Sequence, residues 1–390
     1  MQNLVEFDVH YKAGKHSPVS HDRVAAEKFL QTDPKPGIQI VFGDLDIDTN
    51  IDVVKDLFAI QWAYPATLWH PSCYYSNGYA SSARLMHSDG STVVNTSWFK
   101  FLIIQVDPVP AFSRKPREWK KYEWYEMIFY VYAQSNGSAV AFCINTPKMF
   151  RGNLIDTMNS GKCEIAEDAV SLLQNMILSE VVKLYDASVW TIRDHVRELE
   201  KDRDITRAYR DFPRLHDLAR HIIHSCEVLG VACDSATELI DARRGECSCP
   251  DTNGQAVQLG RPDSDIEMAF SLRSLRNLQR RSDALKARLM NEINLGFNLV
   301  VQGDSTSMKS ISLVTLTFLP ATFVSTIFSM SFFSLQYNDD SGEQEWLVSD
   351  KFWIYWSIAV PLTILAVVCW SYAQQIGAIR LPLSPWTMHR

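Results

Sequence analysis

The sequence predicts an α/β head in the cytosol, followed by long helices and a C-terminal hairpin of two transmembrane helices. Two stretches near the C-terminus, 311–335 and 352–373, contain no charged residue over 25 and 22 positions. At about 1.5 Å per residue, each stretch can cross a bilayer core of about 30 Å. Upstream, segments rich in β-branched and aromatic residues come first and helical periodicity follows. A pair of buried core helices is the alternative interpretation of the two apolar stretches.

The composition excludes several classes of protein. A chain of 390 residues has room for two ordinary domains, and 46% hydrophobic with 21% charged residues is typical of a folded chain. A mean hydropathy of -0.11 excludes a protein built mainly of membrane spans. The net charge of -7 argues against nucleic acid as a partner, and eight scattered cysteines favour a reducing compartment.

The ends of the chain predict its orientation. Met1–Ser20 mixes acidic and basic residues and resembles neither a secretory signal nor a transit peptide. Lys309 precedes the first apolar stretch, and Arg380 and Arg390 follow the second, whereas the segment between them is acidic. The positive-inside rule therefore predicts two spans with both termini in the cytosol. The plasma membrane is the expected location, with an internal membrane as the alternative.

The head is expected to contain strands followed by helices. Segments 38–42, 98–106, 123–133 and 139–144 have strand character, and Asn136-Gly137 predicts a tight turn between the last two. Helical periodicity predicts helices over 164–186, 190–208 and 213–243. The expected domains are a cytosolic α/β domain (1–160), a cytosolic helical region (161–263), a stalk helix (264–310), membrane helix 1 (311–335), a short acidic extracytosolic loop (336–351), membrane helix 2 (352–373) and a cytosolic tail (374–390).

No proline interrupts the sequence from Asp265 to Gln302, and apolar residues recur there at three- and four-residue spacing. No strong stop signal separates this stretch from the first apolar run. One continuous helix from 265 to about 333 would be roughly 100 Å long. Such a helix suggests an oligomeric stalk that leads into a pore.

The first membrane stretch carries a seam of hydroxyl residues. Alternate steps of three and four from Ser305 give a heptad pattern in which six of the eight residues are Ser or Thr. The other members of this seam are Met308, Ser312, Thr315, Leu319, Thr322, Thr326 and Ser329. Neutral hydroxyls can line a hydrated path for a cation, with Met308 and Leu319 as apolar constrictions. Alternatively, the hydroxyls bond back to their own helix or join neighbouring helices.

This stretch resembles the first membrane helix of the CorA-type magnesium transporters. Met308-Lys309, the mid-helix Pro320 and the triplet Ser329-Met330-Ser331 match that family's Met-Lys pair, proline and terminal Gly-Met-Asn in spacing. The resemblance covers 265–373, and in the head it is architectural. It implies a CorA-like funnel in which five copies of the chain surround a pore for Mg²⁺ or another divalent cation. The implied partners are the chain itself, membrane lipid and the transported ion, with no enzymatic activity and no other cofactor.

The resemblance also implies roles for individual residues. By position, Met308, Ile311, Leu319, Thr322 and Ser331 would face the pore, whereas the heptad seam has Ser312 in place of Ile311. In the family the filter asparagine contacts hydrated Mg²⁺. Ser331 would form a wider and weaker ring, so the departure at 329–331 bears on selectivity. Transport of Zn²⁺, Ni²⁺ or Co²⁺ by the same fold and a non-conducting, membrane-anchored regulatory or binding protein are the alternative functions.

Other candidate sites lie outside the pore. Four acidic residues of the extracytosolic loop would concentrate divalent cations in a pentamer, or only set the topology: Asp339, Asp340, Glu343 and Glu345. His221 and His224 share a helix face as metal ligands can, although a helix surface without a metal is favoured. Cys247 and Cys249 are too close for a C-x-x-C zinc motif, and their role is left open. The sequence contains no Gly-rich phosphate loop, G-x-S-x-G or H-E-x-x-H motif of an enzyme.

Overall fold

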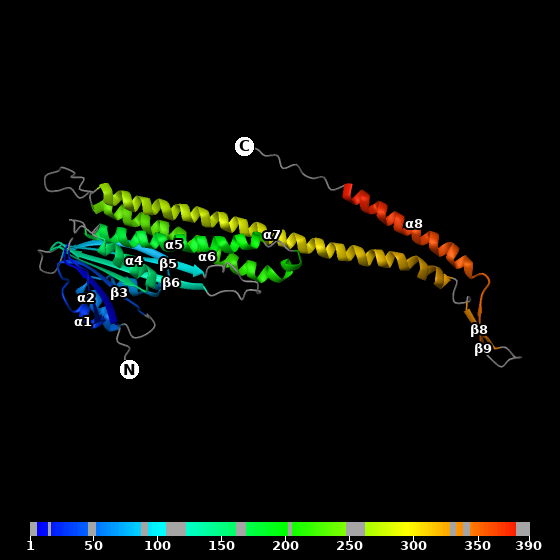
Figure 1. The fold of residues 1–390 in the computed structure, drawn as a ribbon, viewed down its shortest axis with the longest axis horizontal. Coiled ribbons are helices and arrows are strands. Elements are labelled where there is room, and N and C mark those ends of the chain that lie inside the picture. The colour runs from blue at the N-terminus through cyan, green and yellow to red at the C-terminus, as the bar shows by residue number, and fades with distance from the viewer. Residues whose placement is uncertain are drawn as a thin grey trace. The chain divides into compact units, whose positions relative to one another are not determined.

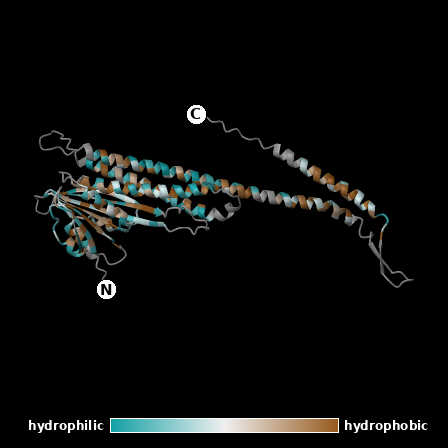
Figure 2. Ribbon diagram, in the orientation of Figure 1, coloured by the Kyte–Doolittle hydropathy of each residue, from teal (hydrophilic) through white to brown (hydrophobic). Residues whose placement is uncertain are grey.

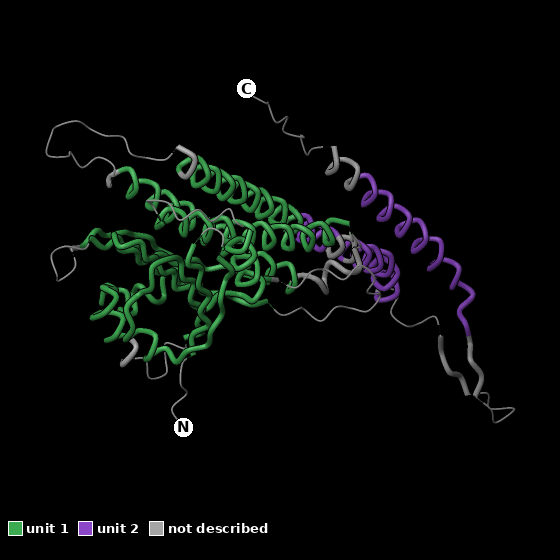
Figure 3. The backbone as a smooth tube through the Cα atoms, turned by 60° about the vertical axis from the view of Figure 1, so that its left-hand side comes forward, with its two compact units in different colours: residues 1–294 green, residues 295–390 purple. Residues whose placement is uncertain are grey.

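The computed structural model describes residues 6–14, 17–45, 52–86, 93–106, 122–160, 169–201, 205–246, 262–327, 333–337 and 344–379. The chain divides into two compact units, Met1–Asn294 and Leu295–Arg390 (Figure 3). The first unit contains a sheet with its covering helices. The second contains the two apolar helices and a short hairpin between them.

A seven-stranded sheet forms the centre of the first unit, in the order β2-β1-β3-β7-β6-β5-β4 (Figure 1). Neighbouring strands are antiparallel except β3 and β7, which are parallel. The strands are β1 (Glu6–Lys12), β2 (Ser20–Ala25), β3 (Gly37–Gly43), β4 (Gly78–Met86), β5 (Val93–Val106), β6 (Tyr122–Gln134) and β7 (Ser138–Ile144). The four predicted strands are confirmed as β3, β5, β6 and β7. The predicted turn joins β6 to β7, with Gly137 at a φ of 87°.

Helices cover both faces of this sheet. On one face, α1 (Ala26–Leu30) and α2 (Asp52–Gln61) bury Phe7, Val41 and Phe142. The short helices η1 (Ala66–Trp69) and α3 (Pro71–Tyr74) follow α2. On the other face, Phe42, Phe99 and Phe129 join a core with α4 (Lys148–Asn159), α5 (Ala169–Lys201), α6 (Ile205–Glu246) and the first part of α7 (Pro262–Ile327).

Two helix boundaries differ from the sequence-based prediction. Helix α5 is continuous through Lys201, whereas two helices, 164–186 and 190–208, are expected from the sequence. Neither Gly nor Pro separates them, and Leu184, Val189 and Ile192 are all buried. Helix α6 begins at Ile205 and passes through Pro213, which the sequence predicts as its start. A single proline removes one helix hydrogen bond, and the turns on either side continue the helix.

The predicted continuous stalk and membrane helix is confirmed as α7, which is 66 residues long. It ends at Ile327, so the predicted extent of membrane helix 1 through Leu335 is wrong. Strand β8 (Phe333–Tyr337) instead pairs with β9 (Gln344–Val348), within the segment expected to be a loop. Phe333, Leu335 and Tyr337 alternate with polar residues, which is the period of a strand and not of a helix. Helix α8 (Phe352–Ile379) completes the second unit.

Candidate functional site

The candidate site lies in the second unit, on two helices long and apolar enough to cross a membrane. These spans are Met308–Thr326 in α7 and Phe352–Tyr372 in α8 (Figure 2). Only 11% of the first span and 6% of the second are buried, whereas the core helix of a soluble protein is mostly buried. Exposed apolar helices of this length need lipid or further protein around them. They support an integral membrane protein rather than the core-helix alternative.

One face of α7 packs against α8. Pro320 and Val324 are buried, and the Tyr355 hydroxyl of α8 lies 3.3 Å from Ser325 Oγ. The same hydroxyl lies 3.5 Å from the carbonyl oxygen of Ala321. Pro320 and Val324 are four residues apart, so they lie on one side of the helix. At its last turns, α7 contacts α8 on this side.

The hydroxyl seam lies away from that covered side. Successive residues of an α-helix rotate by about 100°, which puts the described seam positions roughly 80° to 160° from Pro320. Met308 and Leu319 are 70% and 61% exposed. Ile311, which the family resemblance adds to the pore face, is 67% exposed. The remaining described members are exposed as well: Ser312, Thr315, Thr322 and Thr326. Within one chain, the seam is therefore left without a covering helix in the described residues.

Each described seam hydroxyl bonds back to its own helix. Ser312 and Thr315 donate to the carbonyls of Met308 and Ile311 at 2.9 and 3.0 Å. Thr322 and Thr326 donate to Leu319 and Thr322 in the same way, at 2.9 and 2.8 Å. Because the one O–H donor is used inside the helix, the oxygen offers only acceptor lone pairs outward. The water shell of a hydrated cation points hydrogens outward, so these oxygens are complementary to it.

Back-bonding by itself does not identify a pore. Thr317 and Ser325, which lie off the seam, donate to Leu313 and Ala321 at 2.8 and 2.9 Å. Thr317 and Ser325 are exposed as well, so the seam differs from them in its position on the side of α7 away from the Tyr355 contact. The filter positions Ser329, Met330 and Ser331 lie outside the described residues. So do Asp339, Asp340 and Glu343, whereas Glu345 is in β9, opposite Gln336.

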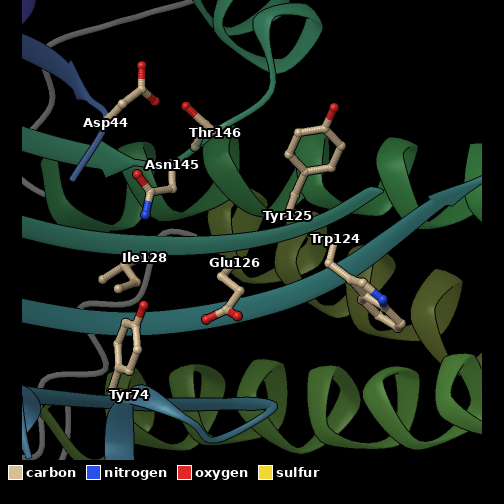
Figure 4. A pocket seen from close by; sticks show the side chains of 8 residues that line it. All are labelled: Asp44, Tyr74, Trp124, Tyr125, Glu126, Ile128, Asn145 and Thr146. Atoms are coloured by element: carbon tan, nitrogen blue, oxygen red, sulfur yellow. The ribbon is translucent and has the colours of Figure 1, made fainter. Parts of the chain in front are cut away.

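The head contains a separate cavity of about 340 Å³ (Figure 4). Its carboxylates already have cationic partners: Asp44 contacts Arg151, and Glu126 lies 3.1 Å from Lys100. The Asn145 amide is occupied too, because it bonds to the backbone of Leu45 at 2.8 and 3.0 Å. This cavity is therefore a poor site for a divalent cation.

The histidines of α6 pack on aromatic rings of β6. The His221 ring lies 4.2 Å from that of Tyr122, and the His224 ring lies 4.4 Å from that of Trp124. This arrangement agrees with the favoured interpretation of a helix surface without a metal. Cys247 and Cys249 lie outside the described residues. The contact of Tyr355 with α7 could not be predicted from the sequence, because it depends on how the two helices meet.

Comparison with known proteins gives one partial sequence relative, and no family model matches the chain. Over 212 residues the chain is 34% identical to the notoamide biosynthesis cluster protein M' of Aspergillus versicolor. The match covers 47% of this chain and 45% of that protein, so it spans about half of the length of the relative.

Solved structures match the chain over almost its whole length. The full-length CmaX protein has a TM-score of 0.58 at 12% identity, covering 96% of this chain and 98% of its own. The CorA magnesium transporter of Methanocaldococcus jannaschii has a TM-score of 0.51 at 14% identity, covering 93% and 96%. Both matches include the head, the long helices and the C-terminal hairpin, as the coverage requires. The chain therefore has a CorA-type fold.

Proposed function

We propose that the chain is a passive channel for divalent cations, with Mg²⁺ as its main ion. Five copies would surround one axis, each contributing the seam of α7 to the pore. The observation that carries the proposal is that the exposed hydroxyl seam lies on the side of α7 away from its contact with Tyr355 of α8, in a chain of CorA-type fold. Both termini would lie in the cytosol, and the plasma membrane is the proposed location.

The filter positions favour a second candidate ion class. Ser329-Met330-Ser331 stands where the family has Gly-Met-Asn. A serine ring contacts a hydrated ion less extensively than an asparagine ring, and Mg²⁺ gives up its water reluctantly. Zn²⁺, Ni²⁺ or Co²⁺ would then pass by the same route. In each case the acidic residues near the extracytosolic hairpin would raise the local concentration of cations.

The test is cation influx into proteoliposomes that contain the purified chain and a Mg²⁺-sensitive dye. Thr322→Phe places a large side chain in the seam and is expected to abolish influx. Thr317→Phe is the matched control, because Thr317 is also an exposed threonine that donates to its own helix but lies on another side of α7. Block by both variants, or by neither, would contradict a pore along this seam. Influx of Zn²⁺ or Co²⁺ without Mg²⁺ would favour the second ion class, and no influx of any ion would favour a membrane-anchored regulatory protein.

A further inference from the structure

The edge of the sheet in the head carries a cluster of metal-ligating side chains on β1 and β2. Side chains alternate along a strand, and Phe7 and Val9 of β1 lie in the core with α1 and α2. Asp8 and His10 therefore point to the opposite face of the sheet. His21 of β2 is the register partner of His10, which brings it to the same face.

The three side chains converge on one point. The Nε2 atom of His21 contacts Asp8 Oδ1, and His10 Nε2 lies 3.7 Å from the same oxygen. One ligand atom from each residue lies within 4.8 Å of the other two. The two imidazole rings stack at 4.7 Å with an interplanar angle of 20°. All three atoms can therefore reach one ion with small side-chain movements.

His10 needs a partner at this point. The residue is 8% exposed, and its Nε2 atom makes no hydrogen bond within the part of the chain that the structure describes. A buried polar atom without a partner is destabilising.

We propose that Asp8, His10 and His21 bind one Zn²⁺ ion in the head, apart from the transport path. Two imidazole nitrogens and one carboxylate suit zinc, whereas Mg²⁺ prefers oxygen ligands. In a tetrahedral site with bonds of about 2.0–2.1 Å, ligand atoms lie about 3.3 Å apart, which is close to the spacing of His10 and Asp8. The site is not a restatement of the transport proposal and holds whichever ion the pore conducts.

The ion has a path into the site. The side chains of His21 and Asp8 are 51% and 32% exposed, so the exposed imidazole can swing away from Asp8 to admit a metal. A water molecule would take the fourth position. Two cations share this face: Arg23 is the register partner of Asp8, and Lys12 Nζ donates to the carbonyl of Met158 at 2.5 Å. Arg23 is exposed and opposes the binding of a cation.

The test is zinc binding to the full-length protein in detergent, measured by competition with a chromophoric chelator. One zinc per chain is expected. His21→Ala and Asp8→Asn should each weaken binding at least about tenfold. Arg23→Gln should tighten it, which a misfolded head would not show. His216→Ala, at an exposed histidine of α6, is the matched control and should bind as the wild type does.

A spectroscopic measurement complements the competition. Co²⁺ in the same protein should give the visible absorption of a tetrahedral site, and His21→Ala should remove it. Unchanged zinc binding in His21→Ala and Asp8→Asn would overturn the proposal, as would the absence of binding in a folded wild type. Zinc that is lost in Thr322→Phe but kept in His21→Ala would belong to the pore and would also overturn it. Influx that persists in Thr322→Phe, with zinc binding retained, would count against the pore proposal and leave the head site standing.

Discussion

The hydroxyl of Tyr355 lies 3.3 Å from Ser325 Oγ, which joins α8 to the last turns of α7. Ser325 donates to Ala321 at 2.9 Å, so the tyrosine meets a hydroxyl that is already held in place. Together with the buried Val324 and Ala359, this contact defines the side of α7 that α8 occupies. Leu319 and Thr322 lie away from this contact, on the side of α7 that is proposed to line the pore.

Removing the Tyr355 hydroxyl should weaken the packing of α8 against α7 without abolishing cation influx. Tyr355→Phe loses the contact to Ser325, and hydrogen bonds between membrane helices contribute about 0.6 kcal/mol on average. Unfolding of the full-length protein in detergent should show a loss of this size, with influx into liposomes retained. Tyr372→Phe is the control, because this side chain is 65% exposed on the same helix. An equal loss in both variants would contradict the role assigned to Tyr355.

The loss of Lys100 and the loss of Glu126, which form an ion pair at the head cavity, should reduce the stability of the protein by different amounts. The side chain of Lys100 is 1% exposed, whereas that of Glu126 is 46% exposed. Lys100→Met leaves a glutamate that water can solvate, with an expected cost of about 1 kcal/mol. Glu126→Leu leaves a buried ammonium with the Tyr74 carbonyl and ring as its partners among the described residues, and should cost about 3 kcal/mol.

Thermal unfolding of the full-length variants measures both costs. The double variant Lys100→Met, Glu126→Leu should be more stable than Glu126→Leu alone, because the buried charge is gone. A double variant less stable than either single variant would show that packing, and not charge, dominates at this cavity.

Four strands of the sheet could be predicted because β3, β5, β6 and β7 are apolar enough to stand out. The sequence of strand β2 is Ser-His-Asp-Arg-Val-Ala. Its charged residues suit an edge strand, but they leave no alternation of apolar and polar residues by which a strand could be predicted. The cluster of Asp8, His10 and His21 could not be predicted, since it exists only through the register of β1 with β2. The continuous helix of α7 could be predicted because it depends on periodicity within one element, and the role of its hydroxyl seam stays a prediction.

The stability of the head should fall in mild acid because of His221. Burial lowers the pKa of His221, Arg220 and His224 lower it further, and Asp217 opposes them. The folded pKa therefore lies below the ordinary value of 6.5. Above pH 6.5 the ring is neutral in both states, and its contribution is complete. Below it, the unfolded chain takes up a proton that the folded chain does not, so stability is lost until the pH reaches the folded pKa.

His221→Gln should reduce this pH dependence. Thermal unfolding between pH 7.5 and 5.5 measures it, and His216→Gln on the same helix is the control. The variant should keep part of the slope, since burial also lowers the pKa of His10. A slope equal to that of the wild type would show that His221 does not titrate with folding.

The acidic residues near the β8–β9 hairpin should increase cation influx only at low salt and low cation concentration. Neutralising all four (Asp339→Asn, Asp340→Asn, Glu343→Gln and Glu345→Gln) removes about twenty carboxylates from the proposed pentamer. Influx at low Mg²⁺ should fall, because the local concentration of cations falls with the surface charge. At about 1 M salt the Debye length is about 3 Å, and the difference should vanish. A loss that persists at high salt would indicate direct binding or damage to the hairpin.

Restoring the family's filter should shift selectivity toward Mg²⁺. Ser329→Gly with Ser331→Asn recreates Gly-Met-Asn, and the longer amide side chains would reach the water shell of an ion on the pore axis. Mg²⁺ keeps several of its waters when bound, so contacts to that shell favour it over ions that exchange water for protein ligands readily. Competitive influx of Mg²⁺ against Co²⁺ should therefore rise in favour of Mg²⁺, whereas Ser357→Asn on α8 should leave the ratio unchanged. An unchanged ratio of Mg²⁺ to Co²⁺ influx in the double variant would indicate that ions are discriminated deeper in the seam, at Thr322 or Thr326. The same competition assay with Thr→Val substitutions at these two positions would test that.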